Sequence, residues 1–154
     1  MTAPRRSPPT GNVRLLRERI KAGWTAPVAR LVGFRLTQVD RGRTRVEMRA
    51  GARHTNPMGT LHGGILCDIA DAAMGIAYVS LLGPGESFTT IELKINFLRP
   101  VWTGGLVATG RIVRKGRTMG LLDCRITDER RRLVAYATST CLTLAAPPGD
   151  GLVR

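Results

Sequence analysis

The sequence is poor in residues that bind metals or form disulfide bonds. It has three cysteines and two histidines in 154 residues. Cys67, Cys124 and Cys141 lie far apart and form no Cys-x-x-Cys pair. Their spacing indicates neither a zinc site nor a disulfide framework. We therefore expect no bound metal.

The sequence also lacks a long apolar run. No stretch is both long enough and sufficiently free of charge to span a bilayer, and the first residues do not contain the uninterrupted apolar segment of a secretory signal. We therefore predict a cytoplasmic protein without a membrane partner. The arginines near the N-terminus, accompanied by the single acid Glu18, leave an organellar transit peptide as the alternative.

Acidic and aromatic residues are scarce. Eleven Asp and Glu residues face 24 Lys and Arg, which gives a net charge of +13, while aromatic residues make up only 5%. A basic excess can indicate a nucleic-acid partner, but these cations are scattered, and no helix-turn-helix, zinc-finger or RNA-recognition pattern occurs. We predict no nucleic-acid partner. A basic surface also suits a small phosphorylated ligand.

The sequence is organised as one domain between two flexible ends. Prolines at positions 4, 8 and 9 predict a flexible leader over residues 1–12, and the ending APPGDGLVR predicts a flexible tail over residues 146–154. Residues 13–145 remain for a single domain, which at this size buries roughly 70% of the surface that its unfolded chain exposes.

Most of this domain shows the alternation of apolar and polar residues that is typical of strands. A short helix comes first, since Val13, Leu16 and Ile20 fall at helical spacing. A β-hairpin follows over residues 33–50, with its turn at 41–43. Four more strands are expected within residues 88–101, 105–118, 119–131 and 132–144, the first of them ended by Pro100. Their short connections favour an antiparallel meander.

Residues 65–82 form an apolar helix with only two charged side chains, Asp68 and Asp71. An amphipathic helix would have one wet face, whereas this helix must be nearly surrounded. A sheet that curls around it meets that requirement. The expected fold class is therefore α+β, with about six antiparallel strands around one long central helix. Polar positions on such a helix must face a partner, a cavity or a ligand.

Three ordered motifs carry a resemblance to a known family. The segments NPMGTLHGGILCDIADAAMG, INFLRP and RKGRT occur in this order, and the chain from Gly33 to Leu144 resembles the hotdog-fold thioesterases, in particular the phenylacetate-degradation branch. The resemblance implies a homodimer, or a dimer of dimers, that hydrolyses acyl-CoA thioesters without metal or organic cofactor. A protein that binds acyl-CoA without hydrolysing it, as a regulator, is the alternative.

The glycines of the HGG motif and Asp71 suit thioester hydrolysis. Gly63 and Gly64 expose backbone N–H groups at a helix start, where a substrate carbonyl can approach and developing negative charge is stabilised. They can instead simply allow close packing of the helix start. Asp71 is our candidate base or nucleophile, because burial would raise its pKa towards that of a useful base. Its alternative role is to accept hydrogen bonds from nearby backbone N–H groups.

Further site residues are implied by the family resemblance. Asn56 and His62 stand at the family's spacing before the helix; His62 would orient the Asn56 loop or the substrate carbonyl, or serve only as a structural histidine. Thr90 replaces a family serine or threonine that helps to hold the attacking group, although threonine is also simply a good strand former. The family binds coenzyme A phosphates with the turn that here comprises Arg114, Lys115, Gly116, Arg117 and Thr118.

The acyl pocket and Asp68 are less well defined by the sequence. Phe97, Tyr78, Trp102 and Met58 are candidates to line the pocket, and they suit either an aromatic or a medium-chain acyl group. Asp68 lies one turn before Asp71, where the family usually has a small or hydroxyl residue. We interpret Asp68 as a carboxylate at the rim of the site or at an interface.

Helix geometry adds a constraint on Gly63 and Asp71. They are eight positions apart in sequence, so they stand about 12 Å from each other along one helix. Groups that polarise and attack the same carbonyl must both lie about 3 Å from it. If both residues act, they must come from antiparallel helices of two subunits.

Overall fold

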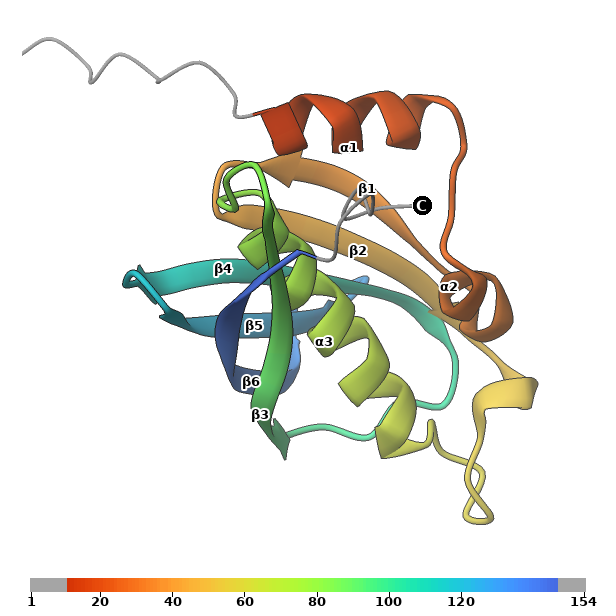
Figure 1. Ribbon diagram of the computed structural model, residues 1–154. Helices are drawn as coiled ribbons and strands as arrows, with labels where there is room; N and C mark the ends of the chain where they lie inside the picture. The colour runs from red at the N-terminus through yellow and green to blue at the C-terminus, as the bar shows by residue number, and fades with distance from the viewer. Residues whose placement is uncertain (1–10, 147–154) are drawn as a thin grey trace, which may run out of the picture.

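The structure, a computed structural model, describes residues 11–146. The predicted leader and tail lie almost wholly outside this range. Among the described residues, no helix is long and apolar enough to cross a membrane. In chain order the elements are α1 (Gly11–Lys21), α2 (Pro27–Val32), β1 (Phe34–Asp40), β2 (Arg43–Ala50), η1 (Ala52–His54), α3 (Gly63–Val79), β3 (Glu86–Phe97), β4 (Gly104–Lys115), β5 (Met119–Asp128) and β6 (Leu133–Ala145) (Figure 1).

The predicted strands and the long helix are confirmed. Two short elements were not predicted. One is α2, which starts with a proline at its first position and stops at Gly33, where φ is +88°. The other is the single helical turn η1, of three residues. Neither is long enough to show an apolar periodicity in the sequence.

The six strands form one sheet in the order β1-β2-β4-β5-β6-β3, and every neighbouring pair is antiparallel. The prediction of a simple meander is therefore wrong for β3, which pairs with β6 at the opposite edge of the sheet from β1. The reason lies in the connection: α3 has 17 residues and so carries the chain about 25 Å before β3 begins. Pro100 follows β3, which ends at Phe97.

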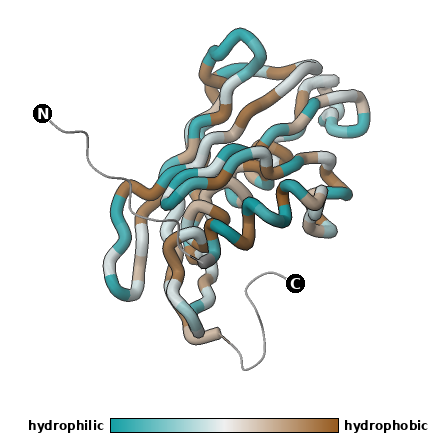
Figure 2. The backbone as a smooth tube through the Cα atoms, turned by 90° about the horizontal axis from the view of Figure 1, so that it is seen from above, coloured by the Kyte–Doolittle hydropathy of each residue, from teal (hydrophilic) through white to brown (hydrophobic). Residues whose placement is uncertain are grey.

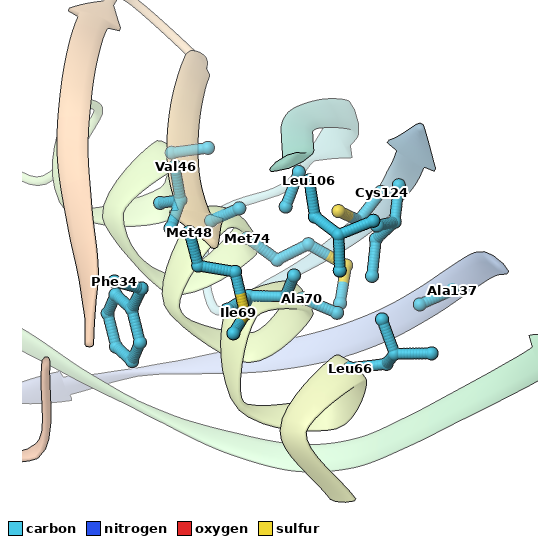
Figure 3. Packing of buried hydrophobic residues seen from close by; sticks show 14 of the residues in the cluster. Phe34, Val46, Met48, Leu66, Ile69, Ala70, Met74, Leu106, Cys124 and Ala137 are labelled. Atoms are coloured by element: carbon cyan, nitrogen blue, oxygen red, sulfur yellow. The ribbon is translucent and has the colours of Figure 1, made fainter. Parts of the chain in front are cut away.

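Helix α3 lies inside the curl of the sheet and contacts all six strands (Figure 1). The buried side of α3 packs into a continuous apolar core with β2, β4, β5 and β6, as Figure 3 shows for Leu66, Ile69 and Met74. Most turns between strands are hydrophilic (Figure 2). The expected hotdog arrangement is confirmed.

The backbone of α3 touches strand β4 directly. A Cβ added to Gly110 on β4 would lie 2.5 Å from the carbonyl oxygen of Ala73, so only glycine fits there without a shift. Thr44 on β2 donates a hydrogen bond to the same oxygen at 2.5 Å. These contacts fix how deep α3 sits in the sheet.

The enclosure of α3 is incomplete within one chain. Asp68 and Asp71 are both exposed, on the side of the helix that faces away from the core. The expectation that Asp71 is buried is therefore wrong for the part of the chain that the structure describes, because no element within residues 11–146 buries this side of the helix. β3, which runs along this side, is an edge strand with a neighbour on only one of its flanks.

Candidate active site

The N-terminus of α3 presents a backbone N–H group that has no acceptor in the described part of the chain. His62 is the N-cap, and its Nδ1 accepts a hydrogen bond from the Gly64 N–H at 3.0 Å. Within residues 11–146, no atom accepts a hydrogen bond from the Gly63 N–H. Of the two predicted carbonyl-binding amides, only that of Gly63 remains available. His62 acts here as the structural cap of the helix, one of its two expected roles.

Phe97 lies directly against Gly63. A Cβ added to Gly63 would lie 2.9 Å from Cζ of the Phe97 ring, and Phe97 is 55% exposed. The structure thus brings together the free amide and one of the predicted pocket residues. A side chain at position 63 would meet the ring and would also cover the face from which a carbonyl approaches.

Asn56 holds its own loop together. Its Oδ1 accepts hydrogen bonds from the N–H groups of Met58 at 3.0 Å and Thr60 at 3.1 Å, and its Nδ2 donates to Thr60 Oγ1 at 2.9 Å. No hydrogen bond joins the Asn56 side chain to Gly63 among the residues that the structure describes. The catalytic role implied for Asn56 stays a prediction, and the observed role is that of a loop residue.

Asp71 is held by a residue of the neighbouring strand. Thr90 on β3 donates a hydrogen bond from its hydroxyl to Asp71 Oδ1 at 3.0 Å. The resemblance implied this pairing, and the structure brings the two side chains together. A donated hydrogen bond fixes the orientation of the carboxylate and leaves its second oxygen to face solvent.

Two residues that precede Asp71 on α3, Asp68 and Cys67, have raised pKa values. Partial burial, together with the Asp71 charge, raises the pKa of the Asp68 carboxyl. Burial also raises the pKa of the Cys67 thiol, and the Asp68 charge adds to this effect. Because the thiolate is the nucleophilic form of cysteine, Cys67 is a poor candidate for attack on a thioester.

A single chain cannot bring Gly63 and Asp71 to one substrate atom. Helix α3 runs without interruption from Gly63 to Val79, so the two residues stand about 12 Å apart along its axis. The constraint derived from the sequence therefore holds for the structure.

The predicted phosphate-binding turn lies at the other end of α3. Arg114 and Lys115 end β4, and residues 116–118 lead into β5. Lys115 Nζ sits 5.3 Å from the centre of the Tyr78 ring, near the C-terminus of α3. Within residues 11–146, Arg114 and Arg117 form no ion pair. Their charges are therefore available to a ligand.

Tyr78 does not line an open pocket. Its side chain is fully buried, its ring packs against Phe88 with centroids 5.6 Å apart, and its hydroxyl lies 2.7 Å from Thr143 Oγ1. The prediction for Tyr78 is wrong because the ring fills the core at the C-terminal end of α3. An added Cβ on Gly120 would lie 2.5 Å from this ring.

The other apolar pocket candidates are strongly exposed. Trp102 is 61% exposed and Met58 is 80% exposed. Ile91 and Leu98, in β3 and just after it, are also exposed. Two open surface pockets formed by residues within 11–146, of about 940 Å³ and 290 Å³, are lined by neither Gly63 nor Asp71. These apolar side chains are therefore open to solvent in the single chain.

Within residues 11–146, no three His, Cys, Asp or Glu side chains lie close enough to hold a metal ion.

One contact near the start of α3, made by His54, was not predicted from the sequence. The backbone carbonyl of His54 accepts the N–H of His62 at 2.8 Å. A contact between backbone atoms leaves no signal in residue types, so spacing alone could not reveal it.

An antiparallel sheet of six strands wrapped around one long helix, with two glycines at the helix start, defines the hotdog fold. The chain belongs to the thioesterase superfamily, whose sequence pattern matches residues 58–135, and within it to the PaaI-like branch.

Relatives and solved structures agree with this placement. The acyl-coenzyme A thioesterase PaaI of Escherichia coli is 31% identical over 108 residues, which cover 70% of this chain and 75% of the relative. The 1,4-dihydroxy-2-naphthoyl-CoA hydrolase of Listeria monocytogenes is 26% identical over 109 residues, which cover 71% of this chain and 89% of the relative. The structure of the E. coli PaaI protein from the phenylacetic acid degradation operon superposes with a TM-score of 0.78 at 25% identity, and the match covers 88% of this chain and 98% of that one.

Proposed function

We propose that this thioesterase hydrolyses acyl-CoA at a site shared by two protomers. The Gly63 N–H of one protomer binds the thioester carbonyl oxygen, and the partner's Asp71 acts as base or nucleophile. The main support is the pair of groups at a fixed separation on α3: an unused amide at its start and a carboxylate two turns later, held by Thr90. Antiparallel pairing of two α3 helices would bring each amide next to the opposite carboxylate.

The chemistry requires only these groups and water. Asp71 as a base takes a proton from water, and the hydroxide attacks the thioester carbonyl. Negative charge develops on the carbonyl oxygen, where the Gly63 N–H and the partial positive charge of the helix N-terminus stabilise it. The C–S bond then breaks, and the proton held by Asp71 passes to the departing sulfur. The products are the free acid and CoA. Alternatively, Asp71 attacks directly and water hydrolyses the resulting anhydride.

Dimerisation is supported by the uncovered side of the chain. Strand β3 has 12 residues and a free edge, and edge strands of this length favour pairing with another strand. The side chain of Phe97, at the end of β3, is apolar and exposed and lies beside Gly63 at the start of α3. A second copy placed there would cover the open side of α3 and form the walls of an acyl pocket. We also propose that two such dimers can associate into a tetramer.

For coenzyme A we propose that the turn of Arg114, Lys115, Gly116, Arg117 and Thr118 binds the phosphates. Tyr78, which Lys115 overlies, is seven residues after Asp71 on α3, and so lies about 10 Å further along the helix. A basic turn at this separation suits a substrate whose phosphates are remote from its thioester. The cytoplasmic location predicted from the sequence stays a prediction.

Replacing Arg114 and Arg117 with alanine is expected to raise KM for acyl-CoA at least about tenfold while kcat changes by less than about threefold. The reason is that contacts to a remote part of the substrate hold the ground state and the transition state equally. Steady-state kinetics of thiol release would measure both constants. Arg130→Ala, in the exposed turn at the opposite end of β5, is the matched control and should leave KM unchanged. An unchanged KM in the double variant would remove the turn from the binding site.

We propose an aromatic or medium-chain acyl group as the substrate. Phe97 beside Gly63 and the exposed Trp102 and Met58 favour an apolar acyl chain, and the Listeria relative is named for an aromatic acyl-CoA. Thiol release from a panel of acyl-CoAs, from acetyl to palmitoyl and including phenylacetyl, benzoyl and naphthoyl, tests the proposal. The largest kcat/KM should fall on aromatic or medium-chain members. Tight binding without thiol release across the panel would instead support an acyl-CoA-binding regulator.

A further inference from the structure

His54 is a buried histidine that the proposed reaction does not use. Only 6% of its surface is exposed. It ends the turn η1, nine residues before the first glycine amide of α3. Its ring nevertheless makes two hydrogen bonds to backbone groups, Nδ1 with the N–H of Gly51 at 3.1 Å and Nε2 with the carbonyl oxygen of Val32 at 2.8 Å.

These two bonds determine the tautomer of a neutral ring. Nδ1 accepts from the Gly51 N–H, so Nε2 carries the hydrogen and donates to Val32 O. Arg53 Nε also lies 3.1 Å from Nε2, but a nitrogen that donates its hydrogen to Val32 has no lone pair for a second donor. The ring therefore ties η1 to the last residue of α2.

The backbone of His54 continues this connection to α3. Its carbonyl oxygen accepts the N–H of His62 at 2.8 Å, and His62 is the residue immediately before Gly63. The loop between them is largely closed on itself: Asn56 bonds to Met58 and Thr60, and Thr55 bridges to Leu61. The His54–His62 bond therefore links the helix start to the fixed end of η1.

We infer that His54 is a positioning residue for the Gly63 N–H. This inference rests on the proposed function, in which that N–H binds the thioester carbonyl. A donor to a developing oxyanion works only within about 2.7–3.1 Å of it, so a small displacement of His62 would weaken the interaction. His54 would act through His62 on the geometry of the amide, without touching the substrate.

The test replaces His54 with leucine and with glutamine. His54→Leu removes both ring bonds and should lower kcat by about tenfold or more, with KM for acyl-CoA within about threefold, since the phosphate turn lies at the other end of α3. His54→Gln keeps a donor for Val32 and an acceptor for Gly51, and it should recover most of the loss. In the dimer labelled with ¹⁵N, the amide signal of Gly63 should shift in His54→Leu and return towards its wild-type position in His54→Gln.

Ser80→Ala is the matched control. Ser80 is also buried, accepts the Gly42 N–H at 2.7 Å and donates to Ala77 O at 2.6 Å, but it lies at the C-terminal end of α3. The Ser80→Ala substitution should lower the melting temperature, as His54→Leu does, but it should leave kcat and the amide signal of Gly63 unchanged. If His54→Leu fails to fold, His54→Asn, which retains only the acceptor for Gly51, takes its place.

Equal losses of kcat in His54→Leu and in Ser80→Ala would overturn the inference. So would an amide signal of Gly63 that does not shift between the wild type and His54→Leu. A wild-type protein that releases no thiol from any acyl-CoA would contradict the proposed function instead. In that case the amide signals alone decide whether His54 sets the position of Gly63.

Discussion

Asp71→Asn is expected to lower kcat by about 10²-fold or more, the usual scale for the loss of a general base. Asparagine has the size of aspartate, and its side-chain oxygen can still accept the hydrogen bond that Thr90 donates at 3.0 Å. The protein should therefore remain folded and bind acyl-CoA within a few-fold of the wild type. What disappears is the negative charge, and with it both basicity and nucleophilicity. Measuring kcat and KM by thiol release separates these effects.

Asp68→Asn serves as the control, because it removes the same charge one turn earlier on the same side of α3. Among the described residues, Thr90 donates its hydrogen bond to Asp71 and not to Asp68. We therefore expect Asp68→Asn to lower kcat much less than Asp71→Asn does. Turnover near the wild-type rate in Asp71→Asn would show that another group attacks. An equal loss in both variants would point to the local charge of the helix rather than to one base.

Gly63→Val is the second variant with a large expected effect. The added side chain would meet the Phe97 ring and would block the approach of a carbonyl to the amide. Losing one oxyanion donor costs about 10²–10³-fold in kcat, and we expect a loss on this scale. Gly51→Ala is the control, since an added Cβ there meets nothing within 4 Å. A Gly63→Val protein with nearly normal kcat would show that the carbonyl binds elsewhere.

Mixing the two inactive variants tests whether the site is shared. In a dimer of one Asp71→Asn subunit and one Gly63→Val subunit, one site carries both defects and the other carries neither. Random exchange at equal amounts makes half of the dimers mixed, so about a quarter of wild-type activity should return. Native mass spectrometry would verify the exchange. If the mixed dimers form and remain inactive, then Gly63 and Asp71 act within the same subunit or do not act together.

The sequence indicated the central elements of the site because each leaves a local pattern. The glycines before an apolar run predicted the start of α3, and the family resemblance predicted the contact between Thr90 and Asp71. Strand alternation predicted all six strands closely enough to find the turns between them. These features depend on residues near one another in sequence or on positions within a known motif.

Other features depend on contacts between distant segments, which no local pattern records. The place of β3 beside β6 follows from the length of the path through α3, and the full burial of Tyr78 follows from Phe88, Thr143 and Gly120 surrounding it. The exposure of Asp71 has a similar origin. An apolar helix predicts that something covers it, but not whether that cover comes from the same chain.

The strand order also has a consequence for how the chain folds as it is made. Glu86 pairs with Ala145 and Phe97 with Ala135, so β3 finds its neighbour only after nearly the whole domain has been synthesised. Helix α3 leaves the ribosome before any of the four strands from β3 to β6, and of the strands that it contacts in the folded chain only β1 and β2 have been made by then. Pairings between distant segments form slowly, and exposed apolar surface favours aggregation while they form. The nascent chain therefore carries its most apolar helix partly uncovered until its last strand is complete.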